Sequence, residues 1–482
     1  MVFSSVVFLF FFLPPVLAVA LLLQGWVNRR GGTGLPLRLA NAWLLLASLV
    51  FYAWGELRLM WVLLLSGALS FLGGLAVARF AGRARFAVLS TFVAANLALL
   101  GWFKYSGLVA DLIHRLGVKF TWAAVALPLG VSFFTFHGLS YVVDVYRGKV
   151  APTRNALDFA CYFALFPQLV AGPIVRFSEV ADAYVRRLTT FADIAEGARR
   201  FITGLGKKVL IANQVAVLAD AAFALTAADR TAATAWLGAA AYALQIYFDF
   251  SGYSDMALGL GRMLGFAFPE NFDHPYVARS VREFWRRWHM TLSRFFRDYL
   301  YIPLGGSRHG AARTAFNLIL VFALCGLWHG ASWTFLAWGL FHGFFLAAER
   351  VLEPATARAP GWLRPLGHLY TLAVVLLAWV LFRCDTWAQA RSIFAAMGDL
   401  ASLGRISSLP WRALAPDVLL AFAAGVLLCA PTAAGLRARL EKISPNSVAF
   451  PPLATVWSLA ILALCLLAVG AGSHNPFIYF RF

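Results

Sequence analysis

Long apolar runs recur along the whole of this 482-residue chain. Hydrophobic residues make up 61% of the sequence, and charged residues make up only 13%. A run of about 20 apolar residues crosses a bilayer as an α-helix, because a helix satisfies its backbone hydrogen bonds within one segment. The sequence therefore predicts an all-α polytopic membrane protein. We expect membrane spans near residues 3–23, 38–55, 58–78, 86–103, 122–145, 209–225, 233–250, 315–328, 332–349, 366–383, 415–431 and 453–471.

The chain is strongly basic, with 41 Lys and Arg residues against 22 Asp and Glu residues and a net charge of +19. Many of these basic residues gather in the loops after the first, third and fifth expected spans. The positive-inside rule places such loops in the cytoplasm, facing anionic lipid, and places the N-terminus outside. We therefore expect membrane lipid, and no nucleic acid, to be the partner of this charge.

The sequence lacks the usual motifs of metal-dependent and nucleotide-hydrolysing enzymes. Its five cysteines are scattered and show neither the CxxC nor the mixed Cys/His spacing of a zinc site. It also has no P-loop and no HExxH motif. We expect no bound metal and no hydrolysis of ATP.

Two segments depart from the pattern of simple spans. Residues 166–177, FPQLVAGPIVRF, place two prolines, a glutamine and a glycine at the end of an apolar run. They fit a re-entrant segment that turns back inside the protein, or the ordinary end of a cytoplasmic helix. Residues 279–313 are basic, yet apolar side chains recur within them at helical spacing. That pattern predicts an amphipathic helix near the cytoplasmic interface.

His329 lies in the apolar stretch WHGASW. Ionisable groups at membrane depth are costly, so each one is a candidate for function. Gly326 and Gly330 would let other backbone or a substrate approach closely, and Trp328 and Trp333 would wall the position. A neutral imidazole there could take a proton from an attacking hydroxyl. It could equally lock two helices together through a hydrogen bond.

His342 follows His329 by 13 residues. On one continuous helix that separation is about 20 Å along the axis and roughly 220° around it. The two histidines could share a site only if the helix breaks between them, so we interpret His342 as a structural or interfacial group. In another apolar run, we interpret Asp249 as a helix-end acceptor and Asp255 as the partner of an arginine such as Arg262.

His289 lies in the basic segment, among aromatic residues and arginines. It fits an interfacial histidine among solvated charges, or a second polar group at the cytoplasmic mouth of a site. Arg286 and Arg297 are among the arginines that could attract a phosphate-rich ligand such as coenzyme A. Anionic lipid headgroups would satisfy these arginines equally well.

The two histidine-bearing stretches resemble those of the membrane-bound O-acyltransferases, and most of all the bacterial alginate O-acetyltransferase branch. They read FWRRWHMTLSRFFRDYLYIPLGG from residue 284 and LWHGASWTFLAWGLFHG from residue 327. Further similar stretches are MVFSSVVFLF at the start, SYVVDVYRG, FPQLVAGPIVRF, YFDFSGYSDMALGLG, and FIYF near the end.

The resemblance implies a ring of about 11–12 transmembrane helices, with re-entrant and interfacial helices around a central tunnel. It implies one membrane domain over residues 1–482, made of N-terminal spans (1–150), a central core (151–350) and C-terminal spans (351–482). It makes His329 the catalytic residue and His289 its second histidine, which would position a thioester or polarise its carbonyl. The expected substrate-binding residues are Trp285, Arg286, Trp288, Arg297, Trp328 and Trp333.

The same resemblance implies what the protein transfers. The donor would be a cytoplasmic acyl thioester, with acetyl-CoA as the expected substrate and no bound cofactor. The acetyl group would cross the bacterial inner membrane to an exopolysaccharide, alginate foremost, directly or through periplasmic acetyltransferase partners. Two alternatives stay open. One is a transporter or flippase with an intramembrane His/Asp relay, although the sequence shows no internal repeat. The other is an O-acyltransferase for a protein, a lipid or another cell-wall polymer.

Overall fold

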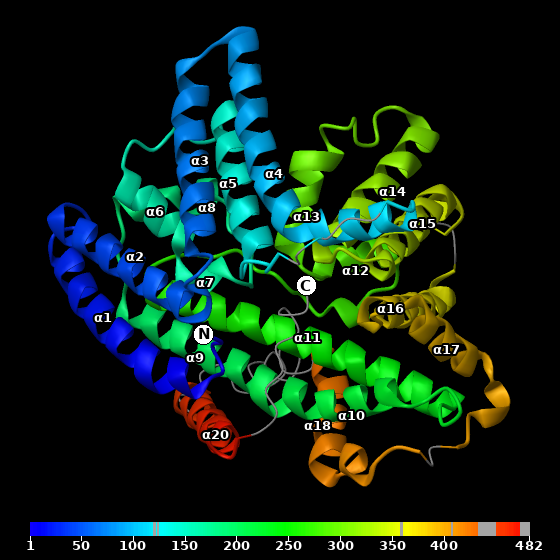
Figure 1. Ribbon diagram of the computed structural model, residues 1–482. Helices are drawn as coiled ribbons and strands as arrows, with labels where there is room; N and C mark the ends of the chain where they lie inside the picture. Colours follow the sequence, from blue (N-terminus) through cyan, green and yellow to red (C-terminus); the bar gives the residue numbers. More distant parts are fainter. Residues whose placement is uncertain (119–121, 123–124, 357–359, 406–407, 432–449, 473–482) are drawn as a thin grey trace. The chain divides into compact units, whose positions relative to one another are not determined.

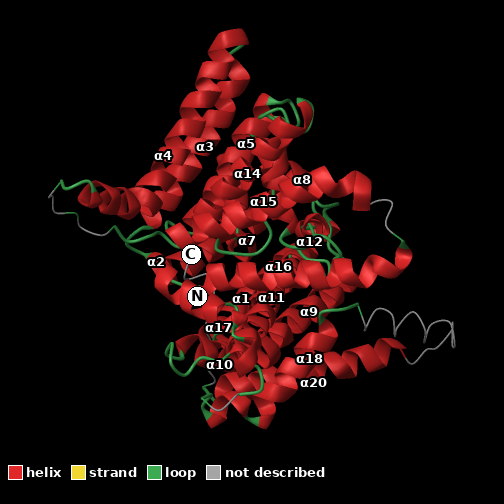
Figure 2. Ribbon diagram, turned by 90° about the vertical axis from the view of Figure 1, so that its right-hand side faces the viewer, coloured by secondary structure: helices red, strands yellow, loops and turns green. Residues whose placement is uncertain are grey.

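The computed structural model describes residues 1–118, 122, 125–356, 360–405, 408–431 and 450–472. Every regular element among these residues is a helix (Figure 2). The chain divides into two compact units, Met1–Phe201 with Tyr253–Glu270, and Ile202–Gly252 with Asn271–Phe482. The all-α class predicted from the apolar runs is therefore confirmed.

The first unit contains the N-terminal helices and two pieces of longer helices (Figure 1). Its elements are η1 (Val7–Phe12), α1 (Leu13–Arg29), α2 (Leu35–Glu56), α3 (Met60–Arg79), α4 (Gly82–Arg115), α5 (Val131–Tyr146), α6 (Ala156–Ala164), α7 (Phe166–Leu169), α8 (Phe177–Val185), most of α9 (Phe191–Gly206) and the end of α11 (Ala232–Met263).

The second unit contains the rest of α9 and α11 and the elements that carry both predicted histidine motifs. Its further elements are η2 (Lys207–Ala212), α10 (Asn213–Ala224), η3 (Pro275–Val277), α12 (Val281–Arg287), α13 (Met290–Phe296), η4 (Arg297–Tyr301), α14 (Gly310–His329), α15 (Trp333–Thr356), η5 (Gly361–Leu363), α16 (Arg364–Arg383), α17 (Trp387–Gly398), η6 (Leu400–Ser402), η7 (Trp411–Leu414), α18 (Pro416–Leu428) and α20 (Phe450–Gly470).

Eight helices among the described residues are long and apolar enough to cross a membrane, so the chain is a multi-pass membrane protein. Each predicted span lies wholly or largely on a helix, with two differences. The span expected at 122–145 becomes helical only at Val131, because Pro128 and Gly130 interrupt the segment before it. The span expected at 415–431 corresponds to α18, which is a shorter apolar helix. The predicted ring, tunnel and domain limits stay predictions.

The segment FPQLVAGPIVRF lies within the first unit. Residues 161–175 are all buried. Within the segment, α7 is a helix of four residues, residues 170–176 are not helical, and α8 begins at Phe177. Gln168 donates to the carbonyl of Tyr162 over 2.7 Å, and the Tyr162 hydroxyl donates to the carbonyl of Val175 over 3.0 Å. Protein groups therefore satisfy this broken backbone, as the re-entrant interpretation requires.

Helices α14 and α15 form a close antiparallel pair in the second unit (Figure 1). A Cβ atom added to Gly326 would overlap the carbonyl oxygen of Phe335, and one added to Gly339 would overlap that of Phe322. Only glycine permits this approach of the two backbones. The sequence predicted a close approach at Gly326, and the approaching group is the backbone of α15.

A buried ion pair joins η2 to α11 in the second unit. Lys208 Nζ lies 2.6 Å from Asp249 Oδ1, and both side chains are only 2% exposed. Asp249 is therefore a mid-helix ion-pair partner, which corrects its interpretation as a helix-end acceptor. In the first unit Asp255 pairs with Arg200 at 2.7 Å, whereas Arg262 pairs with Asp193 at 3.4 Å. The prediction that Arg262 pairs with Asp255 was therefore wrong, because Arg200 on α9 pairs with Asp255 instead.

We predict that Lys208→Met lowers the stability of the second unit by about 3–5 kcal/mol, because it removes the cation that pairs with the buried carboxylate of Asp249. The double variant Lys208→Met with Asp249→Leu should recover most of this loss. The measurement is the melting temperature of the purified protein in detergent. Arg412→Met, which breaks the exposed Arg412–Asp417 pair, is the control and should melt like the wild type. A single Lys208 variant as stable as the wild type would contradict the prediction.

Candidate active site

The backbone breaks at the first of the two predicted histidines. The sequence predicted an amphipathic helix across residues 279–313, but α12 ends at Arg287 and α13 begins at Met290. Between them His289 adopts a left-handed conformation with φ 43°. Among the described non-glycine residues, only His274 shares a positive φ. Such a conformation is costly for a residue with a Cβ, and it persists where surrounding contacts enforce it.

Asn271 supplies the contacts that hold this break. Its Oδ1 accepts hydrogen bonds from His289 Nδ1 at 2.9 Å, from Thr291 Oγ1 at 2.9 Å and from Thr291 N at 3.3 Å. Its backbone carbonyl accepts from Met290 N at 2.9 Å. One loop residue therefore fixes the start of α13 and the orientation of the His289 ring.

These contacts also set the tautomer of His289. An amide oxygen can only accept, so Nδ1 carries the proton that it donates to Asn271. His289 lies outside the candidate spans, is 1% exposed, and has its pKa lowered by burial to about 3. The ring is therefore neutral at physiological pH, and Nε2 carries a lone pair. Among the described residues, Nε2 is buried without a hydrogen-bond partner. His289 is thus an acceptor aimed at a group that the described chain does not provide.

His329 is the last residue of α14 and is 7% exposed. Aromatic rings enclose its imidazole, with centroids at 4.8 Å for Trp328, 5.1 Å for Trp338 and 5.2 Å for Phe382. The Trp328 ring also lies 6.4 Å from that of His289. The structure therefore brings both predicted catalytic histidines to one indole.

His342 belongs to the same cluster, although the sequence interpretation set it aside. Helix α14 ends at His329 and α15 begins at Trp333, so the chain turns back between the two histidines. The Trp338 ring lies 5.1 Å from His329 and 5.1 Å from His342. The interpretation assumed one continuous helix, and the break at residues 330–332 removes that assumption.

The four tryptophans predicted to bind substrate have different surroundings. Trp328 packs against both catalytic candidates, as described above. Trp285 is buried and its Nε1 donates to His342 Nδ1 over 3.3 Å. Trp288 is buried among the rings of Phe284 and Trp379. Trp333 is 44% exposed, whereas the rings of Trp338 and Phe382 pack against His329.

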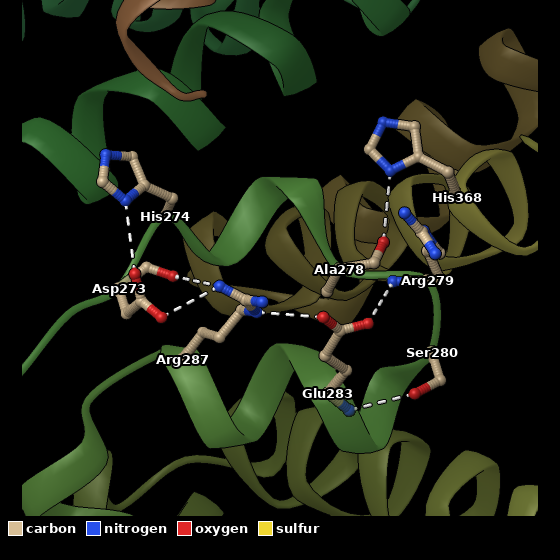
Figure 3. A network of polar contacts seen from close by, with 8 residues as sticks. All are labelled: Asp273, His274, Ala278, Arg279, Ser280, Glu283, Arg287 and His368. Atoms are coloured by element: carbon tan, nitrogen blue, oxygen red, sulfur yellow. Dashed lines mark hydrogen bonds and ion pairs between the residues drawn. The ribbon is translucent and has the colours of Figure 1, made fainter. Parts of the chain in front are cut away.

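Polar contacts hold α12 and the loop before it (Figure 3). Arg287 bridges Asp273 at 2.9 Å and Glu283 at 3.0 Å. Glu283 also accepts from Arg279 N at 2.9 Å, and Ser280 caps the helix by accepting from Glu283 N at 3.0 Å. The charge of Arg287 is therefore balanced by Asp273 and Glu283, and these contacts hold α12 in place beside the site.

The two arginines predicted to attract a phosphate-rich ligand differ in availability. Arg286 is exposed, and in the described part of the chain it has no ion pair. Arg297 is 58% exposed but pairs with its neighbour Asp298 at 2.7 Å. Arg286 is therefore the less neutralised of the two charges.

Sequence reasoning missed three residues of this cluster. Trp338 stands four residues before His342, and this helical spacing was a usable signal that both share one face of α15. Phe382, on α16, reaches His329 from far along the chain. Asn271 lies 18 residues before His289. No local pattern connects these last two with the histidines they contact.

Comparison with known proteins identifies the family of this chain. The sequence profile of the MBOAT, membrane-bound O-acyltransferase family matches residues 46–386. The chain belongs to this family. It is therefore a membrane O-acyltransferase, and the transporter alternative falls away. The family match spans α12 to α15 and thus both histidine stretches.

Individual relatives extend the match over the full length. The chain is 41% identical to the probable alginate O-acetylase AlgI of Azotobacter vinelandii, and the alignment covers 100% of both chains. It is 39% identical to the protein of the same name from Pseudomonas aeruginosa, again over 100% of both. It is 36% identical to the peptidoglycan O-acetyltransferase of Helicobacter pylori, over 83% of this chain and 80% of that protein.

We predict that Asn271→Leu lowers acyl-transfer activity and melting temperature together. The variant leaves the buried His289 Nδ1–H and Thr291 N–H without this acceptor, at about 1–3 kcal/mol each. Thr291→Val is the matched control, since it removes only the hydroxyl donor and should cost less of both quantities. Activity and melting temperature are compared in membranes and in detergent, respectively. An Asn271→Leu variant equal to the wild type in both would show that Asn271 does not fix His289.

Proposed function

We propose that this O-acyltransferase takes an acetyl group from acetyl-CoA at the cytoplasmic face of the bacterial inner membrane. The acetyl group is delivered across the membrane for O-acetylation of an exopolysaccharide. The proposed polymer is alginate, reached directly or through periplasmic acetyltransferase partners. The observation that carries this proposal is the full-length similarity to proteins named as probable alginate O-acetylases.

A thioester donor suits the residues of the second unit. A thioester is activated for acyl transfer, so the reaction needs a base and an oxyanion donor but no metal. The exposed guanidinium of Arg286 on α12 offers a phosphate contact of the kind that a coenzyme A headgroup provides. Trp285 is its neighbour in sequence and contacts His342 in the aromatic cluster. α12 thus connects an exposed cation with the enclosed histidines.

In the proposed reaction His329 is the general base. The acceptor hydroxyl oxygen attacks the thioester carbonyl carbon while the hydroxyl proton passes to His329. The tetrahedral intermediate then collapses, the carbon–sulfur bond breaks, and the sulfur leaves as a thiol after taking the proton back. His329 ends α14, where the negative end of the helix dipole stabilises the imidazolium that forms between these steps.

His289 has a different part in this proposal. A neutral ring that donates from Nδ1 to Asn271 presents only a lone pair at Nε2. It cannot polarise a carbonyl by donating to it, which was one of the two roles expected for it. It can accept from an N–H or O–H group of a substrate, so we assign it to positioning.

We predict that His329→Ala abolishes acetylation of the exopolysaccharide. The host is a strain that lacks the native protein and is complemented at matched membrane abundance. The exposed His309→Ala variant is the matched control and should restore acetylation like the wild type. The measurement is the acetate content of the purified polymer.

The possible results test the catalytic role of His329 and the identity of the polymer separately. Restoration by His329→Ala would remove the catalytic assignment and leave the polymer assignment intact. Failure of the wild type to restore acetate would exclude the tested polymer. In that case peptidoglycan acetate is measured next, because the similar Helicobacter protein is named for that acceptor.

A further inference from the structure

Two buried N–H groups on α15 have no acceptor among the residues that the structure describes. They are Nε1 of Trp338 and Nε2 of His342. Trp338 is 1% exposed and His342 is 0% exposed. Leaving a buried donor unsatisfied costs about 1–3 kcal/mol, and folded proteins keep few such groups without a reason.

The chemistry of the indole group identifies Nε2 of His342 as a donor. Trp285 Nε1 carries a hydrogen and has no lone pair to offer, so in their 3.3 Å contact His342 Nδ1 must accept. A neutral imidazole that accepts at Nδ1 carries its proton at Nε2. The Trp285 contact therefore converts His342 into a fixed N–H donor.

The two donors occupy one face of one helix beside the proposed base. Trp338 and His342 are four residues apart on α15, so their side chains are neighbours. Their ring centroids lie 5.1 Å apart, and the Trp338 ring lies 5.1 Å from that of His329. Trp338 thus stands next to the residue that would take the hydroxyl proton, and His342 stands next to Trp338.

The surroundings of the two donors are aromatic. His342 contacts the rings of Trp285, Phe322 and Phe341, and Trp338 contacts that of Phe382. Aromatic rings offer no strong acceptor, and they keep the local dielectric low. Hydrogen bonds to a developing negative charge are strongest in such a place.

We infer that Trp338 and His342 form the oxyanion-stabilising donor pair, which binds the carbonyl oxygen of the acyl group during transfer. This inference rests on the proposed function. When the hydroxyl attacks, the electron pair of the carbonyl bond moves onto that oxygen, and the two N–H groups donate hydrogen bonds to it. The electron pair on the oxygen forms the carbonyl bond again when the carbon–sulfur bond breaks and the sulfur leaves. Trp338 and His342 keep their protons throughout, and Trp285 acts through His342 as a positioning residue.

The first test removes one donor and keeps the ring. Trp338→Phe should lower kcat by about a hundredfold, the usual effect of losing one oxyanion donor, and should change KM for acetyl-CoA little. Trp379→Phe is the matched control, because Trp379 Nε1 already donates to the Tyr276 hydroxyl over 3.0 Å. Trp379 is equally buried, so its variant reports the cost of losing a structural indole N–H. We expect its kcat to stay within a few-fold of the wild type.

The second test uses His342. In His342→Gln the amide oxygen can accept from Trp285 while the amide N–H₂ donates, so both hydrogen-bonding roles are kept. In His342→Leu neither role is kept. We expect the Gln variant to retain most of kcat and the Leu variant to lose about a hundredfold. A purely structural role for His342 would give both variants the same kcat at matched folded abundance.

Both tests use membrane vesicles from a polymer-producing host. The readout is transfer of labelled acetyl from acetyl-CoA to the polymer, with folded protein quantified by size-exclusion chromatography. If the wild type is active and the Trp338→Phe and His342→Leu variants both keep the wild-type kcat, the donor pair is wrong and the proposed function still stands. A wild type that transfers no acetyl from acetyl-CoA overturns the proposed function instead.

Discussion

The close crossing of α14 and α15 is the constraint on which the site depends. Gly326 and Gly339 let the two backbones meet, and the chain reverses immediately after His329. This reversal sets the end of α14 against the N-terminal part of α15, so Trp338 contacts both His329 and His342. A larger residue at either glycine would push α15 away and separate the proposed base from the donors. In a membrane, where apolar burial contributes little to helix association, such close backbone packing carries much of the contact between helices.

Hydrogen bonds then set the tautomers of His289 and His342. Asn271 accepts from His289 Nδ1 and leaves a lone pair at Nε2. Trp285 donates to His342 Nδ1 and leaves a proton at Nε2. The two imidazoles therefore end with opposite polarity, one as an acceptor and one as a donor, because their partners are an amide oxygen and an indole N–H. A site for acyl transfer needs both kinds of group, one to orient a hydroxyl or amide proton and one to receive a developing oxyanion.

Much of the fold could be predicted from the sequence because its strongest signal is local. Apolar runs of helical length lie on helices, and the prolines and glycine of FPQLVAGPIVRF lie in a buried, mostly non-helical segment. The site was harder to predict from the sequence, because it depends on a helix break at His289 and on several contacts between residues far apart in the chain. The sequence around His289 gives no sign of a left-handed backbone conformation, and apolar residues keep their helical spacing on both sides of it. Likewise, two residues far apart in sequence, Asn271 and Phe382, complete the surroundings of the histidines. The family resemblance paired His289 with His329, whereas the argument that kept His342 apart from His329 assumed one continuous helix, which breaks at residues 330–332.

The most direct test of the central claim is a cryo-electron microscopy structure with a ketone analogue of acetyl-CoA that keeps the carbonyl but cannot transfer its acyl group. The account predicts that the carbonyl oxygen lies within hydrogen-bond distance of Trp338 Nε1 and His342 Nε2, with the carbonyl carbon beside His329. The account would be contradicted if the carbonyl were bound away from α15, or if Trp338 and His342 turned their N–H groups to other protein acceptors while the analogue was bound.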